Sequence, residues 1–491
     1  MSPHVTWNAD GSPCRQVLLP YDPLPVAPAG CLAIDVGEVS AALLAEVDEI
    51  SARVPVLLSL EPGVRLPDMV FEHVVALKLG GGRYDSEPLP PRTQFPAVRY
   101  LHAQRSQALP DGGWLEADEV SLGIYVDDPE KLGTLGAIAD RIVALEVHGA
   151  PSAELWRAAV AALPNLHDVV FATYRTDPAL VAALPDTISH LATRHADDEV
   201  VRAAGGLPHL RSLALSEARL DTLAPLAGAA LRHLSVREGE LGEAAVAELS
   251  GLRTLERLDL HGTPVGDGIA EPLASLSSLQ ALDLENTGVG DRTAAAVGGL
   301  AALRELVLAR TSLGDAGVTA LEPLSALRSL SLRGTQITSA ALAHVPPVGE
   351  LDMAFTGVDD LCSHRDRLGE IRALNLSGSR VGDEGTRCLT EFAHLATLSL
   401  TQTDIGDPTL SRVAELRGLR RLDVAGTGVG DPGIAKLRTL PNLRALDLSG
   451  LPITDASVEV LVALGLQFVA LEGTGLGEAA RERVRASLDG R

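Results

Sequence analysis

Aromatic side chains are scarce in this chain and make up only 3% of its 491 residues. A single large globular core usually contains such rings, because they bury more surface than any other side chain. Hydrophobic residues nevertheless account for 46% of the sequence. The composition therefore favours a core of thin, similar layers of leucine, valine and alanine.

Basic side chains are also in short supply. The 41 Lys and Arg residues face 65 Asp and Glu residues, which leaves a formal net charge of −24. Proteins that bind nucleic acid or anionic membranes present basic surfaces, so the charge argues against both as partners. One interpretation is that the acidic residues keep a large exposed surface soluble. The alternative is that they bind a protein partner with a basic surface.

Cysteine is rare and irregularly spaced, with neither a CxxC pair nor flanking clusters. This usage predicts a reducing compartment. The first residues lack a positive segment followed by an apolar run, and no stretch approaches 18 apolar residues. We therefore expect a cytoplasmic protein. The four cysteines are Cys14, Cys31, Cys362 and Cys388.

A repeated unit dominates the rest of the sequence. It is clearest in LERLDLHGTPVGD from Leu255, LQALDLENTGVGD from Leu279 and LRELVLARTSLGD from Leu303, which begin 24 residues apart. Leucine or a similar residue occupies the first, fourth, sixth and eleventh positions, threonine the ninth and aspartate the thirteenth. At least twelve copies follow one another, and weaker copies begin further upstream. The twelve begin at Leu210, Leu231, Leu255, Leu279, Leu303, Leu327, Val348, Ile371, Leu395, Leu419, Leu443 and Leu466.

This unit resembles a leucine-rich repeat, in the threonine-containing form common in intracellular bacterial proteins. The resemblance is specific from about residue 140 to residue 476. It implies an α/β solenoid, a horseshoe or arc with a parallel β-sheet on its concave face and short α or 3₁₀ helices on its convex face.

Four regions are expected along the chain. Residues 1–30, with six prolines, predict an N-terminal cap, and residues 142–476 the leucine-rich repeat solenoid. Residues 31–141 are either degenerate repeats or a separate α/β capping region. The charged amphipathic residues 477–491 predict a C-terminal capping helix.

Within a unit, the apolar alternation predicts a strand, and the threonine predicts a structural hydroxyl whose oxygen accepts turn N–H groups. We expect the aspartate at the thirteenth position to cap a short helix, because Pro408 and Pro432 directly follow it at the first helical position. Apolar residues three, six and nine places further on predict the buried face of that helix.

The outward positions of the strands predict an acidic stripe. Arg257 and Arg421 lie close enough in sequence to neutralise it, which is one interpretation. The other is a binding surface for a basic protein. Phe355, in the least regular unit, is either an exposed anchor for a partner or a side chain that fills space left by a lost helix. The candidate partner-binding residues are Asp259, Asp283, Asp352, Phe355, Asp423 and Asp447.

No catalytic residue, metal site or cofactor is predicted. The glycine-rich residues 79–85 lack a phosphate-loop ending, the CSHRD segment from Cys362 has the wrong spacing for a ligase centre, and His190 and His195 lack a third metal ligand. The leading hypothesis is a non-enzymatic scaffold that binds a protein on its concave face. The alternative is a regulator that acts in trans on an enzyme such as a GTPase or a ubiquitin-type ligase.

Overall fold

The computed structural model divides the chain into two compact units, Met1–Leu255 and Glu256–Arg491. In both units, parallel strands alternate with turns and short helices along the sequence. The residues that the structure describes are 15–19, 32–36, 47, 56–60, 76–79, 100–104, 119–125, 139–149 and 151–489.

The described residues of the first part of the first unit form six strands, and each pairs in parallel with the next. Three of them coincide with the weak repeat copies that begin at Cys31, Val54 and Val74. Short apolar runs between turn residues thus form strands here, as the sequence predicts. The strands are β1 (Arg15–Leu19), β2 (Leu32–Val36), β3 (Val56–Leu60), β4 (Ala76–Leu79), β5 (Tyr100–Gln104) and β6 (Glu119–Tyr125).

The second part of the first unit alternates strands with helices. Its core contains two of the chain's few aromatic residues, Trp156 and Phe171, with ring centroids 5.6 Å apart. The indole N–H of Trp156 donates to the carbonyl oxygen of Leu180 at 3.0 Å. The main elements are β7 (Ile142–His148), α3 (Ala153–Ala161), β8 (Asp168–Phe171), α4 (Pro178–Ala182), β9 (His190–Arg194), α5 (Asp198–Gly205), β10 (Ser212–Ser216), β12 (His233–Arg237) and α6 (Glu243–Glu248), with a small pair of strands, β11 (Arg219–Leu220) and β13 (Glu240–Leu241).

The second unit is a regular stack of ten three-residue strands. In β14 to β22 the middle residue is a leucine that is at most 2% exposed, while the residues on each side of it are half-buried or exposed, except Ala281, which is 8% exposed. The predicted alternation is therefore confirmed. The strands are β14 (Arg257–Asp259), β15 (Ala281–Asp283), β16 (Glu305–Val307), β17 (Ser329–Ser331), β18 (Glu350–Asp352), β19 (Ala373–Asn375), β20 (Thr397–Ser399), β21 (Arg421–Asp423), β22 (Ala445–Asp447) and β23 (Phe468–Ala470).

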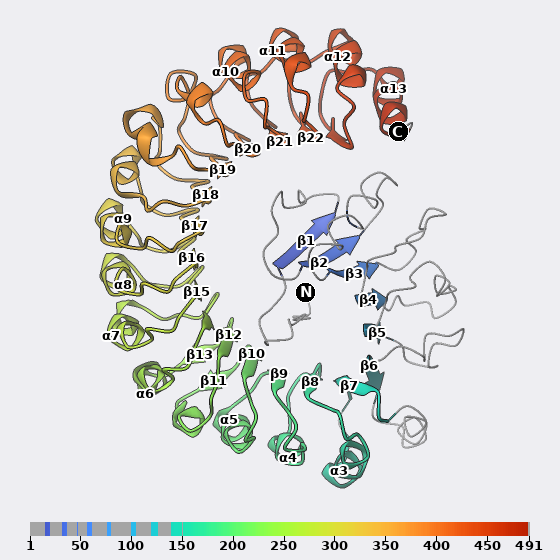
Figure 1. The fold of residues 1–491 in the computed structure, drawn as a ribbon, viewed down its shortest axis with the longest axis vertical. Helices are drawn as coiled ribbons and strands as arrows, with labels where there is room; N and C mark the ends of the chain where they lie inside the picture. Colours follow the sequence, from blue (N-terminus) through green and yellow to red (C-terminus); the bar gives the residue numbers. More distant parts are fainter. Residues whose placement is uncertain are drawn as a thin grey trace. The chain divides into compact units, whose positions relative to one another are not determined.

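Short helices return the chain of the second unit from one strand to the next. Figure 1 shows them on the convex side of this unit, with the strands on its concave side. The predicted apolar spacing is buried, as Val318, Leu321 and Leu324 illustrate at 0–1% exposure. The α-helices are α7 (Ala270–Ala274), α8 (Asp291–Val297), α9 (Asp315–Leu321), α10 (Asp407–Val413), α11 (Asp431–Lys436), α12 (Val458–Ala463) and α13 (Glu478–Asp489), and 3₁₀ helices stand at Asp267–Ile269, Ser339–His344, Cys362–Arg367, Leu389–Glu391, Leu437–Thr439 and Asp455–Ser457.

The final helix, α13, covers most of the segment predicted to cap the solenoid. Val484 on this helix is fully buried, and Arg483 pairs with Glu459 of α12 at 2.7 Å. An amphipathic helix therefore packs against the last repeat, as a cap requires.

The ninth-position threonines are buried and structural, but they donate rather than accept. Thr287, for example, donates its hydroxyl to the carbonyl oxygen of Leu284 at 2.7 Å, which closes the turn after the strand. This bond satisfies a backbone acceptor that the turn would otherwise leave buried and unpaired. The same bond is made by Thr311, Thr335, Thr356, Thr403, Thr427 and Thr474.

The thirteenth-position aspartates do not cap their own helices, and this prediction was wrong. Gly290, with an extended backbone, stands at the capping position before α8, so Asp291 already lies in the first helical turn. Its carboxylate points sideways and accepts the N–H of Gly314, in the next repeat, at 2.8 Å. The same inter-repeat bond is made by Asp267, Asp315, Asp383, Asp407, Asp431 and Asp455.

Candidate functional site

The predicted acidic residues lie on the strand face of the second unit. Asp259, Asp283, Asp352, Asp423 and Asp447 are each the last residue of a strand, and each is half-buried. Parallel pairing sets Asp259 beside Asp283 and Asp423 beside Asp447, while Asp352 stands between Ser331 and Asn375. The structure thus forms two acidic pairs and one single carboxylate rather than an unbroken stripe.

These carboxylates also shape the turn that follows each strand. One oxygen of Asp283 accepts the N–H of Glu285, two residues further on, at 2.8 Å. The same local bond links Asp352 to Ala354 at 3.0 Å. Aspartate is a common turn residue for this reason. The sequence analysis missed this structural role, although an aspartate at the end of five of the ten strands is the expected signal for it. Asp259 and Asp447 make the same bond.

Burial raises the pKa of Asp352 above its ordinary value. The N–H of Ala354 and the charge of Arg333 act in the opposite direction, and the charge of Glu285 adds to the rise. Carboxylates whose burial is not offset by a partner are typical of functional surfaces. Structural networks of charges produce them too.

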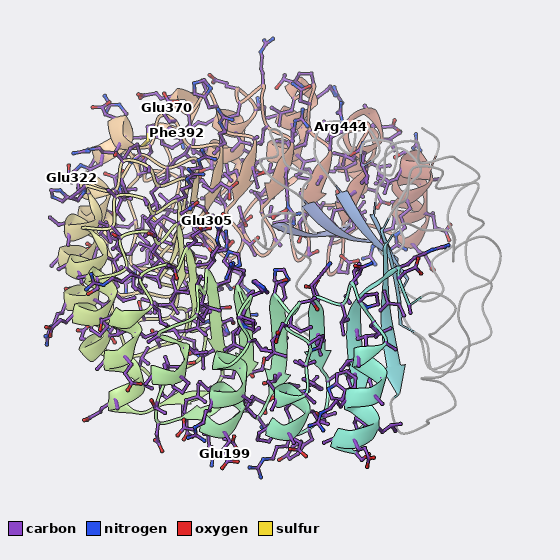
Figure 2. All side chains as sticks on the ribbon, turned by 60° about the horizontal axis from the view of Figure 1, so that its bottom comes forward. Glu199, Glu305, Glu322, Glu370, Phe392 and Arg444 are labelled. Atoms are coloured by element: carbon purple, nitrogen blue, oxygen red, sulfur yellow. A yellow bond between two sulfur atoms is a disulfide. The ribbon has the colours of Figure 1, made fainter. Side chains whose placement is uncertain are left out.

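Burial also raises the pKa of Asp423, and here a partner is close. Arg421 Nε lies 3.1 Å from Asp423 Oδ2, as the neutralising interpretation predicts. Arg257 instead pairs with Glu305 two strands along, at 2.6 Å. Figure 2 shows Glu305 on the strand side of the second unit, whereas Glu322 and Glu370 lie on the helix side.

Phe355 is an exposed aromatic side chain on the same face. Its ring is 47% exposed and therefore does not fill the core. The guanidinium carbon of Arg333, from the preceding repeat, lies 4.8 Å from the ring centroid. On the other side the ring covers Gly378 of the following repeat, where an added Cβ would come within 2.5 Å of it. Three consecutive repeats thus hold Phe355 in place.

The backbone at Phe355 is strained. Its φ is +57°, in the left-handed region that favours glycine, and the equivalent position is glycine in the repeats on either side, at Gly334 and Gly378. A side chain in this conformation costs roughly 1–2 kcal/mol. The sequence analysis missed this signal, which is a bulky residue at the eighth position, where six of the twelve repeats carry glycine. The other non-glycine residues of the second unit at this position are Asn286, Arg310 and Gln402, all with positive φ.

A disulfide links the repeat that contains Phe355 to the next repeat. Cys362 and Cys388 have Cα atoms 5.4 Å apart, and the N–H of Cys388 donates to Cys362 Sγ at 3.0 Å. The spacing of 26 residues gave no indication of this pairing in the sequence. The repeat that contains Phe355 has a 3₁₀ helix, as do the repeats before and after it, and Asp360 accepts the first N–H of its helix at 2.9 Å.

One group among the described residues has the composition of a metal site. It consists of His261, Asp283 and Glu285, whose ligand atoms lie within 4.8 Å of one another. The two histidines considered in the sequence analysis are elsewhere: His190 hydrogen-bonds to Asp168, and His195 lies 3.2 Å from Glu217. The glycine-rich residues 79–85 fall almost entirely outside the described part of the chain.

Similar folds occur in proteins of low sequence similarity. An internalin (inlF) from Listeria monocytogenes is 22% identical, with a TM-score of 0.51 over 68% of this chain and 92% of its own. The mouse RP105/MD-1 complex contains a chain that is 15% identical, with a TM-score of 0.51 over 91% of this chain and 79% of its own. These likenesses concern the fold alone. No curated protein sequence matches the chain.

The family itself is shown by the sequence. A model of the leucine-rich repeat region matches residues 209–473, which is more than half of the 491 residues. The match covers the last part of the first unit and almost all of the second, where the strands and turns repeat most regularly. The chain belongs to the leucine-rich repeat family.

Proposed function

We propose that this protein is a non-enzymatic scaffold that binds a protein partner on the strand face of its second unit, around Phe355. Leucine-rich repeat domains typically serve as protein-binding scaffolds and are generally non-catalytic. The observation that carries the proposal is the exposed ring of Phe355, held in a strained backbone conformation between Arg333 and Gly378.

A preorganised aromatic ring is suited to binding. Aromatic side chains are enriched among the few residues that supply most of the energy at protein interfaces. Phe355 has already lost much of its rotational freedom to its neighbours in the free protein, so a partner would have less entropy to overcome. Strained backbone positions cluster at binding sites for the same reason.

The charges around Phe355 define the partner's chemistry. Asp352 ends the strand that leads to it, and Glu350 begins that strand. The raised pKa of Asp352 reflects burial that Arg333 only partly offsets. A partner with an apolar pocket flanked by Lys or Arg would cover the ring and compensate this carboxylate. Asp259, Asp283, Asp423 and Asp447 extend the acidic character to other repeats of this unit.

The mouse RP105 chain was solved in a complex with MD-1, which is consistent with a binding role for this fold but names no partner for this chain. We therefore propose a partner by chemistry alone. A regulator acting on an enzyme in trans would use the same surface, and the experiment below distinguishes it by the partner's turnover.

The test is capture of a partner on the immobilised full chain, followed by binding kinetics with the purified partner. Phe355→Ala should weaken binding by more than about tenfold, because interface anchors are often worth 2 kcal/mol or more. Gln402→Ala is the matched control, since it changes the same repeat position elsewhere in the unit and should leave affinity unchanged. Equal affinity of Phe355→Ala and the unmodified protein would remove Phe355 from the site.

The acidic contribution is tested with asparagine. Asp352→Asn keeps an oxygen that can accept the N–H of Ala354 and removes only the charge. Binding to a basic partner should weaken, and binding of the unmodified protein should fall as salt rises from about 0.05 to 0.5 M, where the screening length shortens to below about 5 Å. Affinity that is indifferent to both changes would contradict the basic partner while leaving the Phe355 site standing. Altered turnover of a captured enzyme would favour the regulator.

The cellular location is also a proposal. Among the helices that the structure describes, none is long and apolar enough to cross a membrane. We infer a cytoplasmic protein from the sparse cysteines, and the pairing of Cys362 with Cys388 is the observation against it, because disulfides are rare in reducing compartments. Alkylation of thiols in intact cells followed by mass spectrometry would decide: modified Cys362 and Cys388 support the cytoplasm, and protection of both contradicts it.

A further inference from the structure

Three potential metal ligands from two neighbouring repeats converge at the first strands of the second unit. His261 follows β14, Asp283 ends β15, and Glu285 follows β15. The 24-residue spacing sets His261 beside Glu285, because the parallel ladder continues past both strands: the N–H of Gly262 donates to the carbonyl oxygen of Glu285 at 2.9 Å. The repeat thus brings together residues that are up to 24 positions apart.

The imidazole of His261 faces this group. Its Nδ1 lies 3.7 Å from Glu285 Oε2. The atom is shielded from solvent and has no hydrogen-bond partner among the described residues. The contrast with His190 is clear, because its Nδ1 already hydrogen-bonds to Asp168. A shielded imidazole nitrogen without a partner is costly, and binding a metal ion would satisfy it.

Both carboxylates are oriented by their surroundings. Asp283 Oδ1 accepts the N–H of Glu285 at 2.8 Å, which holds the carboxyl group in the turn. Arg310 Nε lies 4.0 Å from Glu285 Oε1, so the arginine attracts that oxygen while Oε2 faces His261. Partners that orient the ligands in this way are usual at metal sites.

The spacing of the ligand atoms fits a small ion after minor adjustment. Ligands about 2.0–2.2 Å from a tetrahedral zinc ion stand roughly 3.4 Å apart. The three ligand atoms here already lie within 4.8 Å of one another, and His261 Nδ1 lies 3.7 Å from Glu285 Oε2. All three side chains are half-buried at the surface, so rotations of their outer bonds would close the remaining distance.

We propose that His261, Asp283 and Glu285 bind a divalent transition-metal ion such as Zn²⁺. One imidazole and two carboxylates form a nitrogen and oxygen ligand set that suits this class of ion better than Ca²⁺ or Mg²⁺, which prefer oxygen alone. The site does not depend on the proposed function around Phe355, because neither Phe355 nor Asp352 takes part in it. Asp283 is the one residue that it shares with the predicted partner-binding surface.

The test is metal binding to the full chain after removal of metal with a chelator. Equilibrium dialysis with Zn²⁺ should show one site per chain that is tighter than any other, and Ca²⁺ at the same concentration should not compete for it. His261→Gln, Asp283→Asn and Glu285→Gln should each weaken that site by at least about tenfold. Asp447→Asn is the matched control, because Asp447 occupies the same repeat position as Asp283 and makes the same turn bond.

The outcomes separate the site from adventitious binding. Zn²⁺ binding that is unchanged in all three variants would place the ion elsewhere and overturn the proposal, as would the absence of a tight site in the unmodified protein. Thermal unfolding without metal checks that the variants fold. Zn²⁺ should raise the melting temperature of the unmodified protein and of Asp447→Asn, and should raise it less in His261→Gln, whose fold does not require the ion.

Discussion

The aspartates that begin the helices of the second unit and those that end its strands recur at the same period, yet their carboxylates meet different groups. Asp267 accepts three hydrogen bonds from the following repeat: from the N–H of Gly290 at 2.8 Å, and from the N–H and hydroxyl of Thr293 at 3.1 and 2.6 Å. Asp447, at the end of β22, accepts the N–H of Ser449 in its own repeat at 2.9 Å. The helix column, formed by the thirteenth-position aspartates, joins repeats. The strand column, formed by the aspartates at the strand ends, contacts groups of its own repeat: Asp447 shapes a turn, and Asp423 pairs with Arg421.

The pKa values differ in direction for the same reason. Burial alone would raise the pKa of Asp267, but the bonds from Thr293 and Gly290 outweigh it and hold the pKa below its ordinary value. Burial raises the pKa of Asp352 and of Asp423, and their neighbours do not offset it. The ionised carboxylate of Asp267 is therefore stabilised by its surroundings. The carboxylates of Asp352 and Asp423 keep a cost of burial that a bound partner would offset.

Removing a helix-column carboxylate should have the largest effect on stability. Asp267→Ala leaves the N–H and hydroxyl of Thr293, a residue that is 0% exposed, without their acceptor. Leaving buried donors unpaired should lower the free energy of unfolding by about 3 kcal/mol. Urea unfolding measures the loss, and hydrogen exchange should show lower protection in the repeats on both sides of the substitution. A loss confined to less than about 0.5 kcal/mol would contradict the joining role.

The sequence predicts where each aspartate lies, but not which partner its carboxylate selects. The spacing from Leu255 to Leu279 fixes strand, turn and helix, because apolar side chains at those positions have to be buried together. An aspartate before a helix normally predicts a cap. The glycine that precedes Asp291 takes the capping position instead, and this shift by one residue turns the carboxylate toward the neighbouring repeat. Only the three-dimensional stacking of repeats shows that neighbour.

The same limit applies to the candidate site. Aspartates at the strand ends are visible in the sequence as an acidic stripe, and Phe355 as an aromatic residue in an irregular unit. The stack of Arg333 on Phe355 depends on side-chain directions in adjacent repeats. The approach of His261 to Glu285 depends on register and on a turn that each preceding aspartate shapes. Residues that are close in the sequence therefore do not reveal either arrangement.

Acid should affect the contributions of Asp267 and Asp423 to stability in opposite directions. The folded-state pKa of Asp267 lies below its ordinary value of 3.8. Its contribution to stability is therefore fully present above pH 3.8 and is lost as the pH falls further, through the lowered pKa. The folded-state pKa of Asp423 lies above 3.8. The cost of its charge is present at neutral pH and is relieved as the pH falls through the raised pKa toward 3.8.

Differences between variants and the unmodified protein isolate these effects. The stability lost in Asp267→Asn should be constant at neutral pH and shrink below pH 3.8. The free energy of unfolding of Asp423→Asn should fall relative to that of the unmodified protein as the pH drops from neutral toward 3.8. The reason is that the unmodified protein is then relieved of the cost of the Asp423 charge. Chemical unfolding across this range measures both. Parallel pH profiles for the two variants would show that the columns do not differ in ionisation.

Removing a strand-column carboxylate should cost less than removing one from the helix column. Asp447→Ala deletes a single hydrogen bond from the N–H of Ser449, at a half-buried position, and should lower the free energy of unfolding by about 1 kcal/mol. Asp447→Asn keeps an accepting oxygen and should be close to neutral. A loss in Asp447→Ala as large as that in Asp267→Ala would erase the distinction between the columns.

The smallest expected effect concerns the eighth position, where side chains stand on the strand side at a cost in backbone strain. Gln402 has a φ of +56°, and glycine holds the equivalent place in the next repeat, at Gly426 with +65°. Gln402→Gly should stabilise the fold by roughly 0.5 kcal/mol, because the strain of about 1–2 kcal/mol exceeds the entropy that glycine loses on folding. Phe355→Gly removes the same strain together with the packing of the ring on Gly378, so its gain should be smaller or absent. If Gln402→Gly instead destabilises the protein, the side chain itself makes a contact that repays the strain, and the eighth position supports the fold in the way that the helix column does.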